Sequence, residues 1–324
     1  MHFQCMFRVK CRKMITIGID LGGTRIKMGI LKGSNILATS QIEAKAGEKM
    51  SKKLLELRDA VDQLLKTHQI DLKTLHGIGL AFPSIVDNRK SKILSRYVKF
   101  TDAEEMDFDS WARESWNIPV VLENDARAAL IGEWQFGAGK GHDHIVMITL
   151  GTGVGSAVLD SGRLLRGAHH YGGNLGGHTI INISGSPCNC GSTGCVETEA
   201  SGWAVHERYK NHMLYQTSSL AREHILTYEA IFSPSNRTDP LAHEIKQHSL
   251  KAWAANVLNF VHHFDPEIVI LGGGIMHSAD EIIPFVQQFV DKNAWQPSGS
   301  IKVLGAQRSD YAGVLGMGYL AAHG

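Results

Sequence analysis

Two glycine-rich turns, each flanked by apolar segments of strand length, constrain the fold of this 324-residue chain most strongly. One lies in IGIDLGGTRIKMGI at 17–30, and the other lies in ITLGTGVGSAVL at 148–159. An apolar stretch on each side of a glycine turn predicts a β-hairpin. The predicted hairpins pair 14–20 with 25–31 and 145–150 with 154–159. Because helices and strands alternate after each hairpin, we predict an α/β protein with two similar lobes.

Helical and strand patterns alternate through the rest of the chain. Residues 51–69 carry leucine and valine at helical spacing, which predicts an amphipathic helix. Asn124 or Asp125 is the predicted N-cap of a helix that runs through 134. The segment 167–202 is predicted to be rich in loops. The other predicted helices are 111–116, 202–214, 240–264, 280–291 and 312–322, and the other predicted strands are 78–82, 119–122, 268–271 and 301–304.

The charge balance gives no electrostatic reason to expect a nucleic acid or an anionic membrane as a partner. The chain has 33 basic and 32 acidic side chains, a formal net charge of +1. Its apolar runs are far shorter than the ~20 residues that span a bilayer. Residues 1–13 lack the apolar stretch of about 7–15 residues that is typical of a signal peptide. With no export signal and with unpaired cysteines, we expect a cytoplasmic protein in a reducing compartment.

The glycine turns also suit nucleotide binding, because glycine lets backbone N–H groups converge on an anion. Asp20, at the end of the first strand, is placed to hold Mg²⁺ through water, and a third turn at 271–275 leaves room for an adenine. Any one turn alone is explained as a tight β-turn, but three together, one led by an aspartate, favour nucleotide binding. No GxxxxGKS or GxxxxGKT segment is present, which excludes a P-loop protein. The candidate nucleotide-binding positions are Asp20, Gly22, Gly23, Thr24, Gly151, Thr152, Gly153, Gly155, Gly272, Gly273 and Gly274.

The segment LENDARAALIGE places Asn124 and Asp125 between a strand and the N-terminus of a helix. Helix capping alone would explain such a pair, and capping is compatible with a catalytic role. A helix N-terminus favours an ionised carboxylate. We therefore expect Asp125 to be held ionised and able to take the proton of an alcohol during phosphoryl transfer. Asn124 is a candidate for hydrogen bonds with neighbouring sugar hydroxyls.

The segment PCNCGSTGCVE at 187–197 holds three of the chain's five cysteines. Cys188 and Cys190 are too close in sequence to pair comfortably in a disulfide. Metal binding explains the cluster better, with free cysteines as the alternative. His178, Cys188, Cys190 and Cys195 would form a Cys₃His set, which is typical of closed structural zinc sites. The rival histidines nearby are His169, His170, His206 and His212.

Five motifs follow one another along the chain. They are Asp-Leu-Gly-Gly-Thr at 20–24, Glu-Asn-Asp at 123–125, Leu-Gly-Thr-Gly-Val-Gly at 150–155, Gly-His at 177–178 and Cys-x-Cys-Gly-x-x-Gly-Cys-x-Glu at 188–197. Together they resemble the ROK family of repressors, open-reading-frame proteins and sugar kinases. The resemblance runs from about Met14 to the C-terminus. It implies a two-lobed, actin-like (RNase H-like) ATPase fold with a zinc-bound loop, and usually a homodimer.

The resemblance also implies how the lobes divide the chain. The small lobe would comprise 14–122 and 306–324 and would bind phosphate and sugar. The large lobe would comprise 123–305, would bind ATP and sugar, and would carry the zinc loop. We expect residues 1–13 to form a disordered tail, or an upstream extension before a second possible start at Met14.

The implied function is phosphorylation of a hexose or hexose derivative by ATP with Mg²⁺, usually at the 6-hydroxyl. Asp125 matches the family's catalytic base, and Asn124, His178 and Glu197 match its sugar-contacting positions. ATP phosphates and Mg²⁺ would lie at 20–24 and 151–155, with the nucleoside near 272–274. The implied partner is a small-molecule sugar, with no nucleic acid and no membrane.

Two positions depart from the family pattern. Leu175 stands in GGNLGGH where the family has a glutamate that holds hydroxyls near the anomeric carbon. Ser84 stands after Pro83 where the family has a glycine. Both changes concern the sugar pocket, in which Ser84 is a further candidate contact, so the identity of the sugar stays open. Asn174 or His170 is a candidate replacement for the lost contact.

Two other functions stand as alternatives to a sugar kinase. A ROK-like protein that binds a sugar without transferring phosphate would explain Leu175, although Asp20 and Asp125 favour catalysis. A transcriptional repressor is disfavoured. Repressors of the family carry an N-terminal helix-turn-helix module, whereas only residues 1–13 precede the first strand here.

Overall fold

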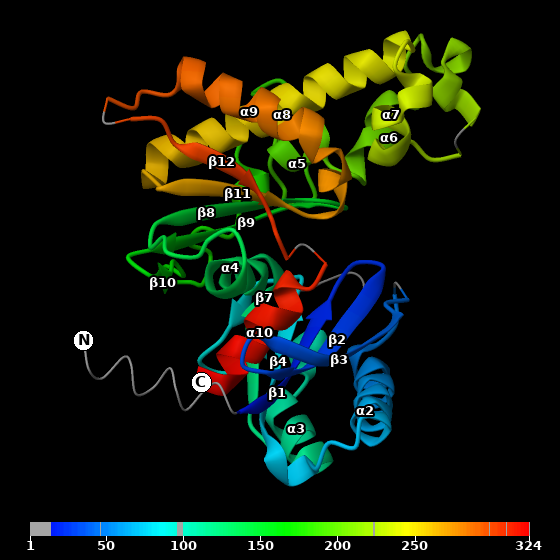
Figure 1. The fold of residues 1–324 in the computed structure, drawn as a ribbon. Coiled ribbons are helices and arrows are strands. Elements are labelled where there is room, and N and C mark those ends of the chain that lie inside the picture. The colour runs from blue at the N-terminus through cyan, green and yellow to red at the C-terminus, as the bar shows by residue number, and fades with distance from the viewer. Residues whose placement is uncertain are drawn as a thin grey trace. The chain divides into compact units, whose positions relative to one another are not determined.

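The computed structural model describes residues 14–45, 47–95, 100–222, 224–297, 299–308 and 310–323. The tail predicted at 1–13 lies outside these residues. The chain forms two compact units, one made of residues up to Lys140 together with those from Asp310 onward, and the other made of 141–309. Each unit contains a mixed five-stranded sheet with helices packed on it (Figure 1). This confirms the predicted α/β class and the two similar lobes.

The first unit is built on a sheet with the strand order β3-β2-β1-β4-β7. Strand β1 (Ile15–Leu21) pairs antiparallel with β2 and parallel with β4, which pairs parallel with β7. The other strands are β2 (Arg25–Lys32), β3 (Asn35–Glu43), β4 (Leu75–Phe82), β7 (Val120–Asn124) and the separate pair β5 (Val86–Asp87) and β6 (Lys92–Ile93). The helices are α2 (Met50–Thr67), α3 (Phe108–Trp116), α4 (Asp125–Phe136) and α10 (Ala312–His323), with 3₁₀ turns at Leu72–Thr74 and Ala103–Glu105.

Side chains alternate along β1, so the two faces of the first sheet differ. Ile17, Ile19 and Leu21 are buried in the apolar core that α2 and α3 complete. Gly18 points the other way, toward α10, where a Cβ at this position would lie 2.1 Å from Val314 O. Asp20 is two residues further along the strand and therefore also lies on the α10 face. The first sheet thus carries an acidic group on the face that a helix backbone approaches closely.

Helix α4 belongs to the first unit, although residues from 123 onward were expected in the second lobe. Glycines bring its backbone against that of α10. A Cβ at Gly132 would lie 2.1 Å from Ala312 O, and one at Gly316 would lie 1.9 Å from Ala128 O. The units divide after Lys140 and before Asp310, which differs from the expected boundaries at 122 and 306. Close packing between helices far apart in the sequence accounts for this difference.

The second unit repeats the arrangement of the first, with the strand order β10-β9-β8-β11-β12. An antiparallel meander of three strands is again followed by two parallel strands. The strands are β8 (Ile145–Leu150), β9 (Val154–Asp160), β10 (Arg163–Leu164), β11 (Ile268–Gly272) and β12 (Lys302–Gly305). The helices are α5 (Val196–Ala200), α6 (Ala204–Tyr209), α7 (Tyr228–Phe232), α8 (Pro240–Phe264) and α9 (Ala279–Asn293), with 3₁₀ turns at Gly176–His178, Tyr215–Thr217, Ser219–Arg222, Pro234–Asn236 and Gly274–Ser278.

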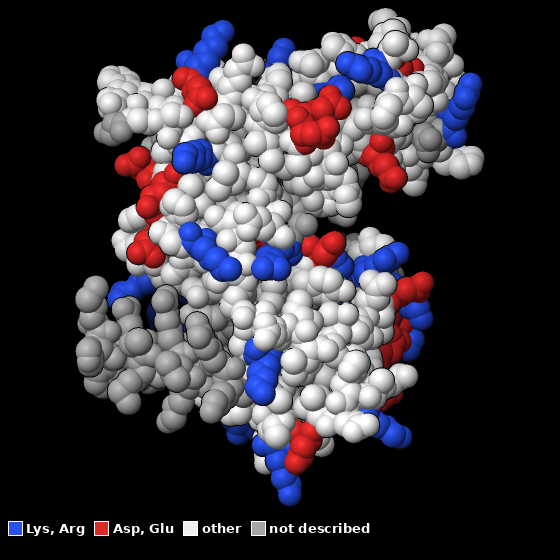
Figure 2. All heavy atoms as spheres, in the orientation of Figure 1, with Lys and Arg blue, Asp and Glu red and all other residues white. Residues whose placement is uncertain are grey.

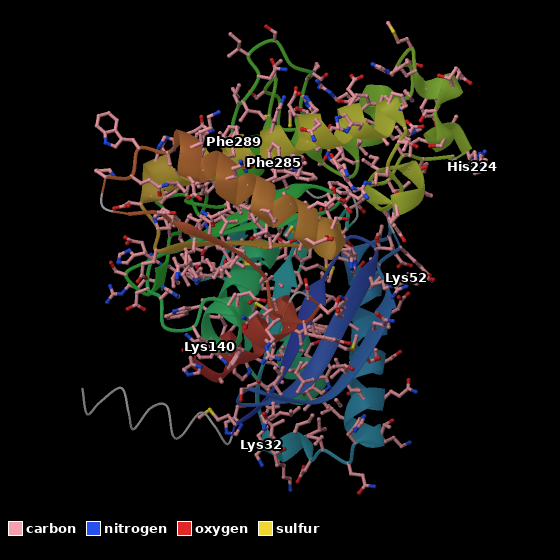
Figure 3. The ribbon with its side chains drawn as sticks, turned by 45° about the horizontal axis from the view of Figure 1, so that its top comes forward. Lys32, Lys52, Lys140, His224, Phe285 and Phe289 are labelled. Carbon is pink, nitrogen blue, oxygen red and sulfur yellow. The ribbon has the colours of Figure 1, made fainter. Side chains whose placement is uncertain are left out.

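Helix α8 covers the core of the second unit. It begins where the sequence predicted, because the Asp239 side chain accepts hydrogen bonds from the Leu241 and Ala242 amides and Pro240 occupies the first turn. Trp253 is fully buried in the core, against which the partly buried Phe285 and Phe289 of α9 also pack (Figure 3). The helix predicted at 202–214 is much shorter than expected, since only Ala204–Tyr209 is α-helical.

Basic and acidic side chains are interspersed on the face drawn in Figure 2, without a broad area of one sign. This pattern agrees with the nearly balanced charge of the sequence. Among the described residues, no helix is both long enough and apolar enough to cross a membrane.

Candidate active site and metal centre

Three parallel strands of the first unit end at one edge of the sheet, where the predicted acidic residues meet. Asp20 lies near the end of β1, Ser84 follows β4, and Asn124 ends β7, directly before Asp125. Asp20 and Asp125 are close enough for the charge of Asp125 to raise the pKa of Asp20. The fold therefore brings together the predicted base and the predicted Mg²⁺ partner.

Asp125 is the first residue of α4, and its carboxylate is held in a defined position. Its Oδ1 accepts hydrogen bonds from the Ala126 amide at 2.8 Å and from Asn124 Nδ2 at 2.9 Å. Oδ2 can therefore take up a proton without breaking either bond. The side chain is partly exposed, but burial of the carboxylate raises its pKa to about 6, against the lowering effect of these hydrogen bonds. Desolvation therefore has a larger effect on the pKa of Asp125 than these hydrogen bonds.

Asp20 is the second carboxylate of this edge. Burial, and then the charge of Asp125, raise the pKa of Asp20 to about 7, while Lys27 acts in the opposite direction. Lys27 lies directly opposite Asp20 across β1 and β2, and its ammonium donates to the backbone oxygen of Asp310 at 2.9 Å. Two neighbouring carboxylates that both resist ionisation would be stabilised by a divalent cation between or beside them. The donor set therefore fits Mg²⁺, which prefers oxygen ligands.

Asn124 connects Asp125 to the loop after β4. Its Oδ1 accepts a hydrogen bond from the Arg127 amide and so caps α4, while Nδ2 donates to Ser84 O at 3.1 Å. The Ser84 hydroxyl lies 2.6 Å from that of Ser95. Ser95 was not a predicted site residue, and no local sequence pattern points to it. The amide of Asn124 therefore positions the carboxylate of Asp125, in addition to any contact with a sugar.

The turn between β8 and β9 presents backbone N–H groups. The Gly151 amide donates to Gly153 O at 3.0 Å within the turn. The amides of Thr152 and Gly153 donate to no acceptor in the part of the chain that the structure describes. Two successive amides of this kind form a concavity that suits an anion. The turn thus has the donors that a phosphate group needs.

The third glycine turn lies beside the second. Strand β11 pairs in parallel with β8. The turn at 272–274, which follows β11, therefore lies beside the turn at 151–153, which follows β8. Gly273 has a φ of 92°, and a Cβ there would lie 2.3 Å from Leu150 O. Glycine is needed at this position for both reasons. The structure thereby brings together two of the three predicted nucleotide-binding turns on one sheet edge.

Glu197, a predicted sugar contact, is hydrogen-bonded within the second unit. Its Oε2 accepts from the Val154 amide at 2.9 Å, and its Oε1 accepts from Trp203 Nε1 at 3.2 Å. Trp203 was not predicted as a site residue, and its position directly before the short helix α6 carries no such signal. The carboxylate therefore touches the glycine turn directly.

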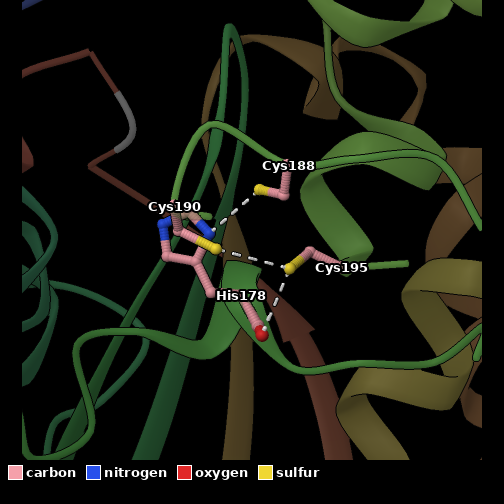
Figure 4. Close-up of side chains that lie close together, drawn as sticks. All are labelled: His178, Cys188, Cys190 and Cys195. Carbon is pink, nitrogen blue, oxygen red and sulfur yellow. Dashed lines mark hydrogen bonds between the residues drawn. The ribbon is translucent and has the colours of Figure 1, made fainter. Parts of the chain in front are cut away.

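The predicted Cys₃His set converges in the second unit (Figure 4). The distance from Cys190 Sγ to Cys195 Sγ is 3.7 Å, and that from Cys188 Sγ to His178 Nδ1 is 3.6 Å. A tetrahedral zinc ion places two sulfur ligands about 3.8 Å apart, and a sulfur and a nitrogen ligand about 3.6 Å apart. The four residues match a zinc site in composition, these two distances match its spacing, and all four donor atoms lie within 4.8 Å of one another. The rival histidines His169, His170, His206 and His212 are not part of the cluster.

Leu175, which replaces the family's glutamate, precedes the 3₁₀ turn that carries His178. Its side chain is 40% exposed, so it does not point into the core. The neighbouring Gly176 is packed so tightly that a Cβ would lie 2.3 Å from a ring atom of Phe260. Asn174, a candidate replacement, has a buried Oδ1 that accepts no hydrogen bond from the described residues. The local backbone is thus fixed, while position 175 stays accessible to a ligand.

Known proteins resemble this chain along nearly its whole length. The glucokinase of Thermotoga maritima is 30% identical over 317 residues, which cover 94% of this chain and 96% of that protein. The structure of a ROK family glucokinase from Streptomyces griseus, in complex with glucose and AMPPNP, is 28% identical and has a TM-score of 0.79, with 96% of this chain and all of that chain covered. The xylose repressor of Bacillus subtilis is 29% identical over 75% of this chain and 60% of its own length. A sequence profile of the ROK family matches residues 16–323, and the chain, with its duplicated actin-like sheet, belongs to the ROK family.

Proposed function

We propose that this protein is a sugar kinase that transfers the γ-phosphoryl group of ATP to a hexose or hexose derivative, at the 6-hydroxyl, with Asp125 as the general base. The kinase relatives support phosphoryl transfer to a sugar. The observation that carries the proposal is the pair of carboxylates, Asp125 beside Asp20, both partly exposed at the edge where the parallel strands of the first sheet end.

The pKa of Asp125 suits a base that works near neutral pH. A carboxylate with a pKa of about 6 is mostly ionised at pH 7, yet it is more basic than an ordinary aspartate. It takes the proton of the sugar hydroxyl as that oxygen forms a bond to the γ-phosphorus. The bond from the γ-phosphorus to the bridging oxygen breaks, and ADP leaves with the electron pair of that bond.

The glycine turns of both units are proposed to bind the nucleotide. The amides of Thr152 and Gly153 are available as donors to phosphate oxygens, and the turn at 272–274 gives an adenosine group access to the backbone. Gly22, Gly23 and Thr24 follow Asp20 and are proposed to contact the transferred phosphoryl group. When bound, Mg²⁺ supplies charge neutralisation at the phosphates, and Asp20 would hold it through water.

The Cys₃His cluster is proposed to hold a structural zinc ion, because all four positions would be filled by protein ligands. His178 Nδ1 is the nitrogen next to Cys188. His178 Nε2 would remain free to bond a sugar hydroxyl, so the metal would orient a sugar-binding imidazole. Asn124, Ser84 and Glu197 are the other proposed sugar contacts.

The test is an ADP-release assay with ATP and Mg²⁺ against a panel of hexoses and amino sugars. We expect sugar-dependent ADP release with at least one member of the panel and none without sugar. The alternative function is a ROK-like protein that binds a sugar without phosphorylating it, which Leu175 favours. Sugar binding by calorimetry without ADP release for any member of the panel would support that alternative and contradict the kinase proposal.

A further inference from the structure

Glu197 is fixed against the glycine turn by bonds to both of its carboxylate oxygens. Oε2 lies 2.9 Å from the Val154 amide nitrogen, and Oε1 lies 3.2 Å from Trp203 Nε1. Gly153 leaves the space that this requires, since a Cβ there would lie 2.6 Å from Glu197 Oε2. Any residue larger than glycine would push the carboxylate away from the turn.

The backbone amides of Gly202 and Trp203 also bind this turn. The Gly202 amide donates to Gly151 O at 2.9 Å, and the Trp203 amide donates to Thr152 O at 3.0 Å. The approach is close, because a Cβ at Gly202 would lie 2.8 Å from Gly151 O. These bonds explain why the helix predicted from 202 begins only at Ala204. Trp203 thus contacts the turn through its backbone and Glu197 through its indole.

We propose that Trp203 is a positioning residue that couples sugar binding to nucleotide binding. The inference rests on the proposed function, in which Glu197 contacts the sugar and the turn at 151–155 contacts the phosphates. A carboxylate oxygen has two lone pairs, so each oxygen of Glu197 keeps one for a sugar hydroxyl while the protein bonds stay in place. A sugar bound to Glu197 therefore stabilises the conformation in which Glu197 is hydrogen-bonded to the Val154 amide. A phosphate bound to the turn stabilises the same conformation.

The indole N–H of Trp203 determines how strongly sugar binding and nucleotide binding are coupled. Without it, Oε1 of Glu197 loses its protein donor, and the carboxylate can rotate about its terminal bond and release the Val154 amide. Coupling between two ligands is reciprocal and typically amounts to about 5–150-fold in affinity. We expect the native protein to bind its preferred hexose at least about fivefold more tightly when AMPPNP and Mg²⁺ are present.

The experiment measures hexose affinity by calorimetry with and without AMPPNP and Mg²⁺, using the hexose with the highest kcat/KM in the ADP-release panel. In Trp203→Phe, which keeps an aromatic ring but has no N–H, the ratio of the two affinities should approach one. The affinity for each ligand alone should change much less than this ratio. Trp295→Phe is the matched control, because Trp295 is 85% exposed, and it should keep the native ratio.

A second variant, Trp203→Leu, also lacks the N–H donor and is measured in the same way, so that the conclusion rests on whichever variant melts within a few degrees of the native protein. A native ratio in either folded variant overturns the coupling role of Trp203. An equal loss of affinity for both ligands, with the ratio unchanged, also overturns it, because that result is a general structural effect. Failure of the native protein to bind both ligands would instead contradict the proposed function.

Discussion

Asp125→Asn tests the proposed base with little change to the structure around it. The amide oxygen of asparagine can accept the same two hydrogen bonds, from the Ala126 amide and from Asn124 Nδ2, that now end on Asp125 Oδ1. The variant loses only the group that takes up a proton. Removing a general base costs about 10²–10⁴-fold in rate, so kcat should fall by that factor while the affinity for the sugar stays within a few-fold.

The raised pKa of Asp125 predicts how the native enzyme responds to pH. With a pKa of about 6, the carboxylate is about nine tenths ionised at pH 7 and about one tenth ionised at pH 5. The rate kcat/KM should therefore fall about tenfold between these values. A base with the ordinary value of 3.8 would lose almost nothing over this range.

The same pKa predicts that Asp125 destabilises the fold at neutral pH. The folded state binds more protons than the unfolded state between pH 3.8 and about 6, so stability falls as pH rises through this window. A shift of this size corresponds to at most about 3 kcal/mol. Asp125→Asn should therefore unfold at higher urea concentration than the native protein at pH 7.5, with the difference vanishing near pH 4.

The assay is ADP release, with urea unfolding measured in parallel. Asp59→Asn serves as the control, since the Asp59 side chain is 73% exposed, and it should change neither rate nor stability. Turnover by Asp125→Asn within a few-fold of the native protein would remove Asp125 from the mechanism. A flat profile of kcat/KM between pH 5 and pH 7 would refute the argument from burial.

Three further predictions concern the metals and the sugar pocket. The purified protein should contain about one zinc ion per chain, and Cys190→Ser should lose both the metal and sugar binding; active protein without zinc would contradict this. Asp20→Asn should weaken Mg²⁺ binding or activity by about 10–100-fold, as measured by a Mg²⁺ titration of turnover, and an unchanged titration would exclude Asp20 as its partner. Leu175→Glu should fold normally, because Leu175 is 40% exposed, and should raise kcat/KM for glucose relative to the natural substrate, since a carboxylate accepts charge-assisted bonds from two hydroxyls; an unchanged sugar profile would place specificity elsewhere.

The parts of the fold that the sequence predicts are those with strong local signals. Glycines between apolar strands mark both hairpins, and Asp239 with Pro240 marks the start of α8. Strand β3 was not predicted, because Leu37 and Ser40 break the alternation of apolar and polar residues, although exposure alternates along the strand and Ala38 is buried. The position of α4 in the first unit depends on contacts with α10, nearly two hundred residues away. Tertiary contacts of this kind have no local pattern.

The sequence indicates residue types for a candidate site, but it does not indicate the pKa values of these residues. The cysteines and His178 are recognisable because zinc needs four donors of these types, and the four side chains do converge. The pKa of Asp125 depends on how much protein surrounds the carboxylate, and the sequence gives only its position at a helix N-terminus. Trp203 and Ser95 could not be found in this way, because the side chain of each contacts a candidate site residue from a segment that carries no motif.

The two sheets share one topology but carry different chemistry at equivalent positions. In the first sheet, the next-to-last residue of the leading strand is Asp20, whereas in the second it is Thr149. The first sheet adds Asp125 after its last parallel strand, while in the second the amides of Thr152 and Gly153 donate to no acceptor among the described residues. A proton acceptor and a partner for Mg²⁺ require carboxylates, whereas phosphate oxygens are bound by N–H donors such as the amides of Thr152 and Gly153. Divergence between the duplicated sheets is therefore what lets one fold offer both an acidic edge and an anion-binding edge.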